Sequence, residues 1–302
     1  MSHQTIIVLD FGSQYTQLIA RRLRELSVYS EIWPPDTPAD TIRTRAPVGM
    51  ILSGGPKSVS DAGAPRCDPA LFDMGSPVLG ICYGMQLMAH TLGGRVAPAP
   101  QREFGHATVT ITGRSGASGQ PRRSGEAAKA GGTAVVSKSA VLFTDVPDQI
   151  RVWASHGDFV AAVPAGFSVV ATSANAPVAA MANADRGLYA LLFHPEVAHT
   201  ERGLDILRNF AYGICRCTGD WTMASFVEEA TAKVRAQVGA GRVVCALSGG
   251  VDSTVAALII HRAVGDKLTC IFVDNGVLRL DEAAQIRKRY ERLELPLVFV
   301  DA

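Results

Sequence analysis

The sequence predicts an α/β fold made of two successive units, each built on a mostly parallel sheet with helices on both faces. Two observations support this prediction. Short runs of β-branched and aliphatic residues alternate with amphipathic helical patterns, which is typical of parallel sheets with crossover helices. The same alternation restarts after residue 221. We therefore expect a mixed, mostly parallel domain over residues 1–212, a linker over 213–221 and an incomplete, doubly wound domain over 222–302.

The first domain is predicted to open with a buried strand at residues 6–9, a glycine turn at Gly12 and an amphipathic helix over residues 15–26. Two further buried strands, 49–52 and 78–81, each end in a glycine-rich turn. Short, continuous apolar runs of this kind indicate strands that are covered on both faces.

The pattern changes at Thr108, where apolar and polar residues begin to alternate as they do in antiparallel strands. Residues 141–143 and 169–172 are expected to be strands of this kind. A buried strand at 189–193 and a helix at 204–212 then complete the domain.

A polar stretch over residues 113–139 interrupts this domain. It is dense in Gly, Ser and Ala, and it carries five basic residues and one acidic residue. Such a composition cannot bury enough apolar surface to order itself, so a flexible insertion is predicted. A tether for an anionic ligand is the alternative.

The second domain is predicted to alternate helices and buried strands. The expected helices cover residues 223–237, 253–262 and 281–293, and the expected strands cover 243–247, 268–273 and 297–300. Three parallel strands make only half of a doubly wound sheet and leave one edge open.

The bulk composition excludes several classes of protein. The 302 residues are 47% hydrophobic and 19% charged, with a net charge of +1, so no nucleic-acid or membrane partner is expected. No apolar run reaches the roughly 18 residues of a membrane span, and the N-terminus lacks the pattern of a signal peptide. Cys215 and Cys217 form a CxC pair without a second ligand pair, so no metal site is expected. Cysteines in apolar segments fit a reducing compartment, and the cytoplasm is the expected location.

A candidate nucleophile lies in the segment Gly80-Ile81-Cys82-Tyr83-Gly84, between a buried strand and a predicted helix. The glycines permit a sharp strand-to-helix turn that lifts the middle side chain above the sheet. The positive end of the following helix favours the thiolate, the reactive form of cysteine. The alternative is a buried cysteine between two turn glycines. The pattern is that of a nucleophile elbow, and it predicts Cys82 as the nucleophile.

The matching base is predicted in Phe193-His194-Pro195-Glu196, at the end of a buried strand, where open α/β sheets hold their ligand sites. His194 can accept the thiol proton and later protonate a leaving amine near neutral pH. Glu196 can hold the imidazole in one orientation. The alternative is a core histidine followed by an acid that starts a helix.

Donors for a developing oxyanion are predicted at two places. The turn Ser53-Gly54-Gly55-Pro56 can present a bare backbone N–H group at Gly55. The N–H group of Tyr83, directly after the nucleophile, is the second donor. For the glycine segment, the alternative is an ordinary turn.

These segments, in this order along the chain, resemble the class I glutamine amidotransferases. The resemblance implies that Cys82, His194 and Glu196 attack the carboxamide of glutamine, release ammonia and hydrolyse a glutamyl thioester without any cofactor. It also implies that Gln86 lies against glutamine. Within Trp153-Ala154-Ser155-His156-Gly157-Asp158, it places Asp158 near the amino group of glutamine.

A candidate phosphate loop follows the strand predicted at 243–247. Its six residues are Ser248, Gly249, Gly250, Val251, Asp252 and Ser253. Backbone N–H groups at a glycine turn and a helix N-terminus together form an anion cradle. No lysine follows the glycines, so the loop is not a Walker A motif. The alternative is a plain helix cap by Asp252 or Ser253.

The complete SGGVDS loop resembles that of the N-type ATP pyrophosphatases, which split ATP between the α and β phosphates. With the run Phe272-Val273-Asp274-Asn275-Gly276 and the later Leu278-Arg279, the chain resembles the GMP synthetase family, except at 113–139. The resemblance implies ATP and Mg²⁺ at the loop and amination of xanthosine monophosphate (XMP) by ammonia from glutamine. It also implies homodimers formed through a region beyond residue 302, where the nucleotide site would lie.

Other interpretations stay open at this point. Pyrimidine and anthranilate amidotransferases share the first domain but not the SGGVDS loop, and NAD synthetases usually join the loop to a different nitrogen-releasing domain. The remaining alternatives are a fragment with glutaminase activity only and a non-catalytic, truncated product.

Overall fold

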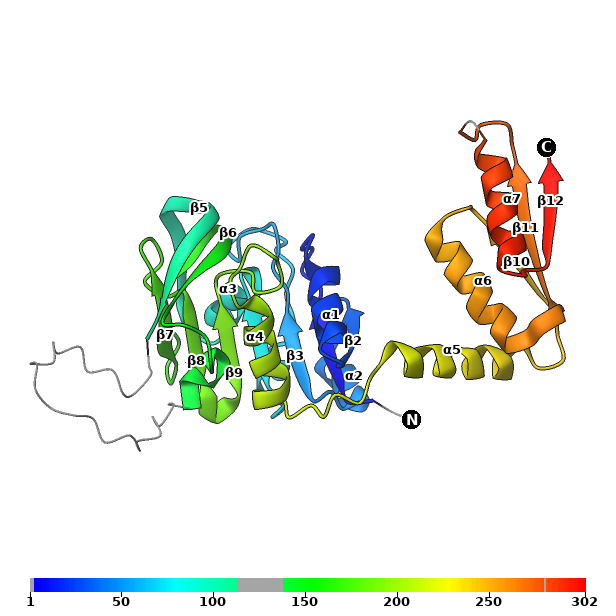
Figure 1. Cartoon of the computed structure of the whole chain (residues 1–302). Coiled ribbons are helices and arrows are strands. Elements are labelled where there is room, and N and C mark those ends of the chain that lie inside the picture. Colours follow the sequence, from blue (N-terminus) through cyan, green and yellow to red (C-terminus); the bar gives the residue numbers. More distant parts are fainter. Residues whose placement is uncertain (1–2, 113–137, 280) are drawn as a thin grey trace, which may run out of the picture. The chain divides into compact units, whose positions relative to one another are not determined.

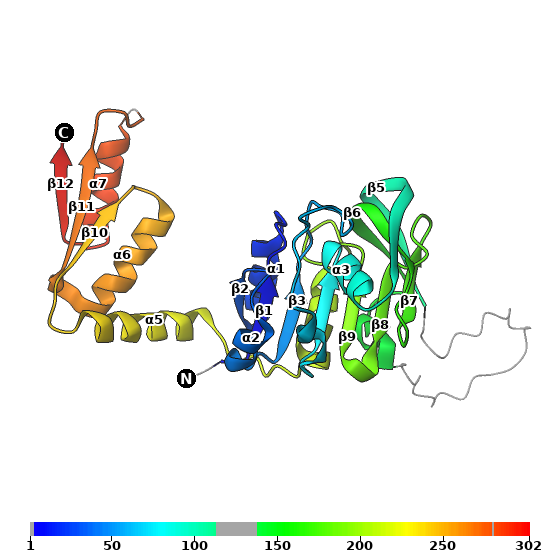
Figure 2. The same ribbon diagram turned by 180° about the vertical axis from the view of Figure 1, so that it is seen from behind.

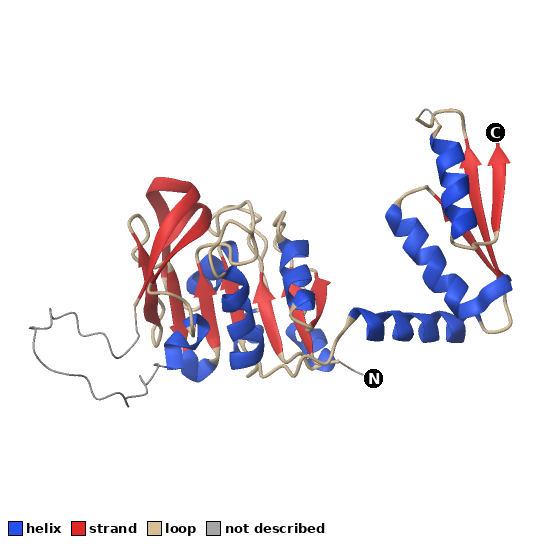
Figure 3. Ribbon diagram, viewed as in Figure 1, coloured by secondary structure: helices blue, strands red, loops and turns tan. Residues whose placement is uncertain are grey.

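The computed structural model describes residues 3–112, 138–279 and 281–302. The chain divides into two compact units, Met1–Trp221 and Thr222–Ala302. Strands flanked by helices form both units (Figure 1, Figure 3). Most of the insertion expected at 113–139 lies outside the described residues.

A nine-stranded sheet organises the described part of the first unit, in the order β2-β1-β3-β4-β9-β8-β7-β5-β6. The strands from β2 to β9 in this order pair in parallel, and those from β9 to β6 pair antiparallel. The bounds are β1 (Thr5–Leu9), β2 (Tyr29–Trp33), β3 (Gly49–Leu52), β4 (Val78–Ile81), β5 (Arg95–Ile111), β6 (Gln149–Ala162), β7 (Ser168–Ser173), β8 (Ala180–Asn183) and β9 (Leu188–Leu191).

Helices cover both faces of the parallel part of this sheet (Figure 1, Figure 2). Side chains of α1 (Thr16–Glu25) and α4 (Gly203–Arg208) join one core cluster. Side chains of α2 (Ala39–Arg45) and α3 (Tyr83–Thr91) join the other. Every residue of β1, β3, β4 and β9 is buried, which explains why these strands are continuous apolar runs in the sequence.

The prediction of a strand at 141–143 is wrong. These residues belong to a 3₁₀ helix, Lys138–Phe143, in which Leu142 and Phe143 point into the core. Three apolar residues are too few to show a period, so the pattern could not separate a strand from a helical turn.

A long antiparallel hairpin, β5–β6, brings the middle of β6 to the ends of the central strands. Its register shifts between Pro98 and Glu103. The middle of β6 then reaches the end of β9, where Ala154 forms a bridge with Phe193. The residues that follow Ala154 therefore lie beside the segment that carries His194.

The segment expected to be a linker, 213–221, packs onto the first unit instead. After α4 the helix continues as a π-helix, Asn209–Ile214, and the side chains of Cys215, Cys217 and Trp221 are buried. Cys215 contacts Gly49, where the absence of a side chain leaves room for its sulfur. Apolar side chains spaced along the segment hold it in the core.

The second unit contains a parallel sheet in the order β10-β11-β12. Its elements are α5 (Met223–Val238), β10 (Val243–Leu247), α6 (Val251–Val264), β11 (Leu268–Asp274), α7 (Glu282–Arg292) and β12 (Leu297–Asp301). Phe272, Ile286 and Tyr290 are central to its own core. No helix in the described part of the chain is long and apolar enough to cross a bilayer.

Candidate active site

Cys82 occupies the sharp turn between β4 and α3. Its backbone has φ +50° and ψ −104°, a region that a residue with a side chain rarely adopts. Hydrogen bonds on both sides hold the turn. Cys82 N–H donates to the Leu191 carbonyl at 2.7 Å, and Gly84 N–H donates to the Ser53 carbonyl at 3.1 Å. The strained turn is therefore tied to both neighbouring strands.

The two glycines of the turn are required by the packing around it. A Cβ atom on Gly80 would lie 2.7 Å from the carbonyl carbon and oxygen of Gly84. A Cβ atom on Gly84 would collide with the carbonyl oxygen of Leu52. The glycines allow α3 to begin directly against β3 and β4, which fixes the position of the sulfur.

His194 and Glu196 follow β9, the strand next to β4. His194 Nδ1 lies 2.8 Å from Glu196 Oε1, and the exposed fractions of the two residues are 3% and 0%. The main chain fixes the ring position, since His194 N–H donates to the Trp153 carbonyl. The Tyr15 ring packs edge-on against the imidazole, with 5.1 Å between ring centroids. The Glu196 carboxylate and the Tyr15 ring therefore both hold the imidazole in place.

The charge state of His194 follows from its neighbours. Burial disfavours the charged ring, but hydrogen bonds with Cys82 and Glu196 and the negative charge of both raise the pKa of His194 to about 10. The site thus stabilises an imidazolium beside the sulfur, which is the arrangement that supports a thiolate nucleophile.

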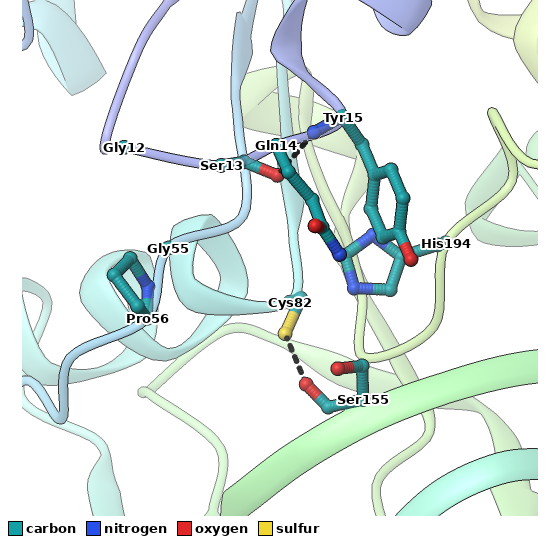
Figure 4. A pocket seen from close by; sticks show the side chains of 9 residues that line it. All are labelled: Gly12, Ser13, Gln14, Tyr15, Gly55, Pro56, Cys82, Ser155 and His194. Atoms are coloured by element: carbon teal, nitrogen blue, oxygen red, sulfur yellow. Dashed lines mark hydrogen bonds between the residues drawn. The ribbon is translucent and has the colours of Figure 1, made fainter.

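The Cys82 thiol faces a cavity of about 350 Å³ that His194 also lines. Its Sγ donates to the Ser155 carbonyl at 3.4 Å (Figure 4). The same figure shows Gln14 and Tyr15 on the loop between β1 and α1, above Cys82 and His194. Rotation of the thiol can redirect its proton from Ser155 to the imidazole.

A second cavity, of about 540 Å³, meets the first at Cys82. Gly55, Pro56, Cys82 and Ser155 line both cavities. The residues that line the second cavity alone include Lys57, Ser58, Asp61, Gln86, Arg102 and Asp158. The second cavity is therefore lined by charged side chains, and it holds the two side chains expected near glutamine.

Gln86 is held at the wall of this second cavity. It is 4% exposed, and its Nε2 donates to the Asp158 carbonyl at 3.0 Å. Helix α3 is thereby tied to strand β6 at Asp158. The structure brings both predicted substrate residues to one side of Cys82.

The two expected oxyanion donors also lie at Cys82. Tyr83 is the first residue of α3, so its N–H group has no intrahelical acceptor. Gly55 lines both cavities, and a Cβ atom there would lie 2.7 Å from the Phe11 carbonyl oxygen. A bare backbone at Gly55 is therefore required by the packing.

Sequence reasoning missed a buried polar group behind the second cavity. His156 Nε2 lies 3.1 Å from Glu103 Oε2, and Glu103 Oε1 accepts from Asn175 Nδ2 at 2.8 Å. Burial lowers the pKa of His156, although Glu103 acts in the opposite direction. The only sequence signal was the position of His156 two residues before Asp158, because the pairing with Glu103 depends on the register of the hairpin.

The second unit holds the predicted phosphate loop between β10 and α6. Gly249 has φ +80°, which favours glycine. Ser248 Oγ lies 3.0 Å from Ser253 Oγ and accepts from Gly250 N–H at 3.3 Å. Helix α6 starts at Val251 with Asp252 in its first turn. The loop is folded around its own serine hydroxyls at the N-terminus of a long helix.

The described residues offer no candidate metal site. Within them, no group of three or more His, Cys, Asp or Glu side chains could hold a metal ion.

Comparison with known families assigns the first unit. Residues 7–214 match the model described as "Glutamine amidotransferase class-I". The chain belongs to the class I glutamine amidotransferase family. Residues 241–288 of this amidotransferase match a second model, the "tRNA methyl transferase HUP domain". The second match lies entirely within the second unit.

Curated relatives of this amidotransferase extend the similarity across both units. The chain is 49% identical over 303 residues to "GMP synthase [glutamine-hydrolyzing]" of Geobacillus kaustophilus, covering 100% of this chain and 54% of the relative. The protein of the same name from Bacillus subtilis is 48% identical over 301 residues, covering 99% and 54%. The chain therefore spans about half the length of these relatives.

The crystal structure of a GMP synthase subunit from Thermoplasma acidophilum is similar to this chain as well. It is 32% identical with a TM-score of 0.56, and the match covers 76% of this chain and 98% of that protein.

Proposed function

We propose that the first unit hydrolyses the carboxamide of glutamine and that this chain is the N-terminal part of a GMP synthase. The observation that supports the first claim is the position of Cys82 on a strained turn beside a buried His194–Glu196 pair. Membership of the class I amidotransferases names the reaction class, and the GMP synthase relatives name the product.

In the proposed reaction His194 takes the proton of Cys82, and the thiolate attacks the amide carbon of glutamine. The N–H groups of Gly55 and Tyr83 stabilise the oxyanion. His194 then protonates the leaving ammonia, and water hydrolyses the thioester to glutamate. The glutamine chain lies in the second cavity, beside Gln86 and Asp158.

The second unit is proposed to bind ATP on the loop from Ser248 to Ser253. Backbone N–H groups near Gly249 and Gly250 and the N-terminus of α6 favour phosphate oxygens. Mg²⁺, when bound with ATP, neutralises charge on the phosphates, and Asp252 is the loop residue with a suitable carboxylate. In the whole protein, ATP activates XMP, and ammonia from the first unit replaces the adenylate. Homodimers and a cytoplasmic location are part of the same proposal.

The decisive test of the glutaminase claim is Cys82→Ala. We expect this change to lower glutamine hydrolysis about 10⁴-fold or more, because no other group can form the thioester. It should also abolish covalent labelling by the glutamine analogue 6-diazo-5-oxo-L-norleucine, followed by intact mass. Cys245→Ala, in the second unit, is the control and should leave labelling unchanged.

In the full-length protein, Cys82→Ala should leave GMP formation from added ammonium intact. Loss of the glutamine-dependent and ammonium-dependent reactions together, in a protein that remains folded, would show that the division of labour between the units is wrong. Labelling at a residue other than Cys82 would reject the nucleophile itself.

A further inference from the structure

The cavity on the His194 side of Cys82 lies where the leaving group of the proposed reaction departs, and glutamine alone does not fill it. The proposed acyl group lies in the second cavity, with Gln86 and Asp158. The two cavities meet at Cys82, and His194 lines only the first. His194 is the group that protonates the leaving nitrogen, so that nitrogen must point into the first cavity.

The size of this cavity exceeds what its leaving group needs. A water molecule requires about 10–15 Å³ of comparable space, and ammonia is of similar size. The cavity measures about 350 Å³. A substituent on the amide nitrogen therefore has room on this side, whereas the acyl chain is placed on the other side, with Gln86 and Asp158.

The wall of the cavity opposite Cys82 is the loop from Gly12 to Tyr15. The Gln14 side chain is exposed and extends from this loop toward Cys82 and His194 (Figure 4). Tyr15 packs on the imidazole ring. Gln14 is thus the side chain that a group on the leaving nitrogen would meet, and it can be changed without disturbing the core.

We propose that this cavity, lined by Gln14, Tyr15 and His194, is a leaving-group site. The chain accordingly also hydrolyses γ-glutamyl amides that carry a small substituent on the amide nitrogen. This inference rests on the proposed glutaminase function.

The chemistry balances as it does for glutamine. The Cys82 thiolate forms a bond to the amide carbon, and the C–N bond breaks. The proton from His194 goes to nitrogen, so that γ-glutamyl methylamide releases methylamine. Water then enters the same cavity, gives a proton to His194 and attacks the thioester, which yields glutamate and the free thiol.

The test compares kcat/KM for γ-glutamyl methylamide with that for glutamine, by measuring glutamate release. We expect turnover of both by the unchanged chain. Gln14→Ala should raise the methylamide-to-glutamine ratio about tenfold and Gln14→Trp should lower it by a similar factor, since one methyl group in a pocket changes selectivity about 10-fold or more. Gln17→Ala, an exposed glutamine on α1 that lines neither cavity, should leave the ratio unchanged.

A second measurement applies to the chain even if its turnover is slow. Glutamine and γ-glutamyl methylamide should both protect Cys82 from labelling by 6-diazo-5-oxo-L-norleucine. Gln14→Trp should weaken protection by the methylamide far more than protection by glutamine.

The outcomes separate the two proposals. If glutamine is hydrolysed or protects Cys82, but the methylamide does neither in the unchanged chain and in Gln14→Ala, the leaving-group site is wrong and the glutaminase proposal stands. A ratio that is the same in all three Gln14 forms also rejects the site. If Cys82 is not labelled and glutamine is not hydrolysed, the glutaminase proposal itself fails.

Discussion

Glu196 is fully buried, and its carboxylate contacts the His194 ring through one oxygen. The other oxygen, Oε2, has no hydrogen-bond partner among the described residues. A carboxylate in such a place is stable only beside a positive charge, because burial strongly disfavours an unpaired anion. The buried pair therefore favours the charged imidazole.

Replacing Glu196 with Gln keeps the shape of this side chain and removes its charge. We expect kcat for glutamine to fall about 10²–10⁴-fold, because the imidazole loses the group that orients it and stabilises its charge. The pKa of His194 should fall from about 10, which NMR titration of the ring would measure. Glu201→Gln, at an exposed ion pair with Arg151, is the matched control. An unchanged kcat in Glu196→Gln would remove Glu196 from the site.

The His194–Glu196 pair makes the free energy of unfolding depend on pH. The pKa of His194 is raised from 6.5 to about 10 by folding, so the folded state holds this proton more tightly than the unfolded state. The stabilisation is complete below pH 6.5 and is lost as pH rises through 10. In urea unfolding, the difference in stability between the unchanged chain and Glu196→Gln should therefore narrow from pH 6.5 to pH 10. A difference that widens over this range would contradict the raised pKa.

At the scale of elements, the turn from β4 into α3 depends on close contact between backbones. Gly84 touches the main chain of Leu52, so any side chain there pushes α3 away from β3. We expect Gly84→Ala to lower the free energy of unfolding by about 1–3 kcal/mol, as overpacking does, and to slow labelling of Cys82. Chemical denaturation and mass spectrometry measure the two effects.

Gly213→Ala is the control for this substitution. Gly213 lies in the π-helix after α4, and a Cβ atom there would meet Val141 at an ordinary 3.5 Å. Gly213→Ala should change the free energy of unfolding by less than about 1 kcal/mol. Equal effects at Gly84 and Gly213 would mean that the elbow is not the tight point of the fold.

How far the sequence predicts these elements depends on how local their signals are. The bounds of β3 and β4 were predicted to the residue, because a strand covered on both faces is a continuous apolar run between turns. The strands β2, β6 and β8 and the helix α2 were missed. The sequences of β2 and β8, YSEIW and AMAN, have neither such a run nor a clear alternation.

Prediction of the candidate site likewise depends on how local the sequence signals are. Cys82, His194 and Glu196 are in short motifs with their own turn chemistry, so the sequence alone singled them out. The contact of Ser155 with Cys82 depends on the bridge between β6 and the segment after β9, and that of Glu103 with His156 depends on the shifted register of the β5–β6 hairpin. No local pattern encodes that register, and Gln14 likewise reaches the cavity only through the packing of the β1–α1 loop.

At the scale of the molecule, the two units differ in how well they cover their sheets. The first unit has a core on each face of its sheet, whereas the second has a single core. In the second unit Val244, Val273 and Val298 are 67%, 46% and 47% exposed. The smaller unit therefore buries less apolar surface for each residue that it orders.

We predict two thermal transitions, the first of them from the second unit. Unfolding enthalpy is about 0.7 kcal/mol per residue, so the first transition should have roughly a third of the enthalpy of the second, by calorimetry. Covalent labelling of Cys82 should raise only the second transition. A single transition that labelling shifts as a whole would mean that the units unfold together.

The pairing of β4 with β9 also sets the time at which this protein becomes reactive during its synthesis. A nascent chain that has emerged only as far as residue 187 contains the thiol but neither the neighbouring strand nor the imidazole. Its sulfur is then an ordinary cysteine on an unfinished sheet. In the proposed reaction, the ribosome must supply almost the entire first unit before glutamine can be consumed, because the strand that precedes the base is the last strand of the nine-stranded sheet to be synthesised.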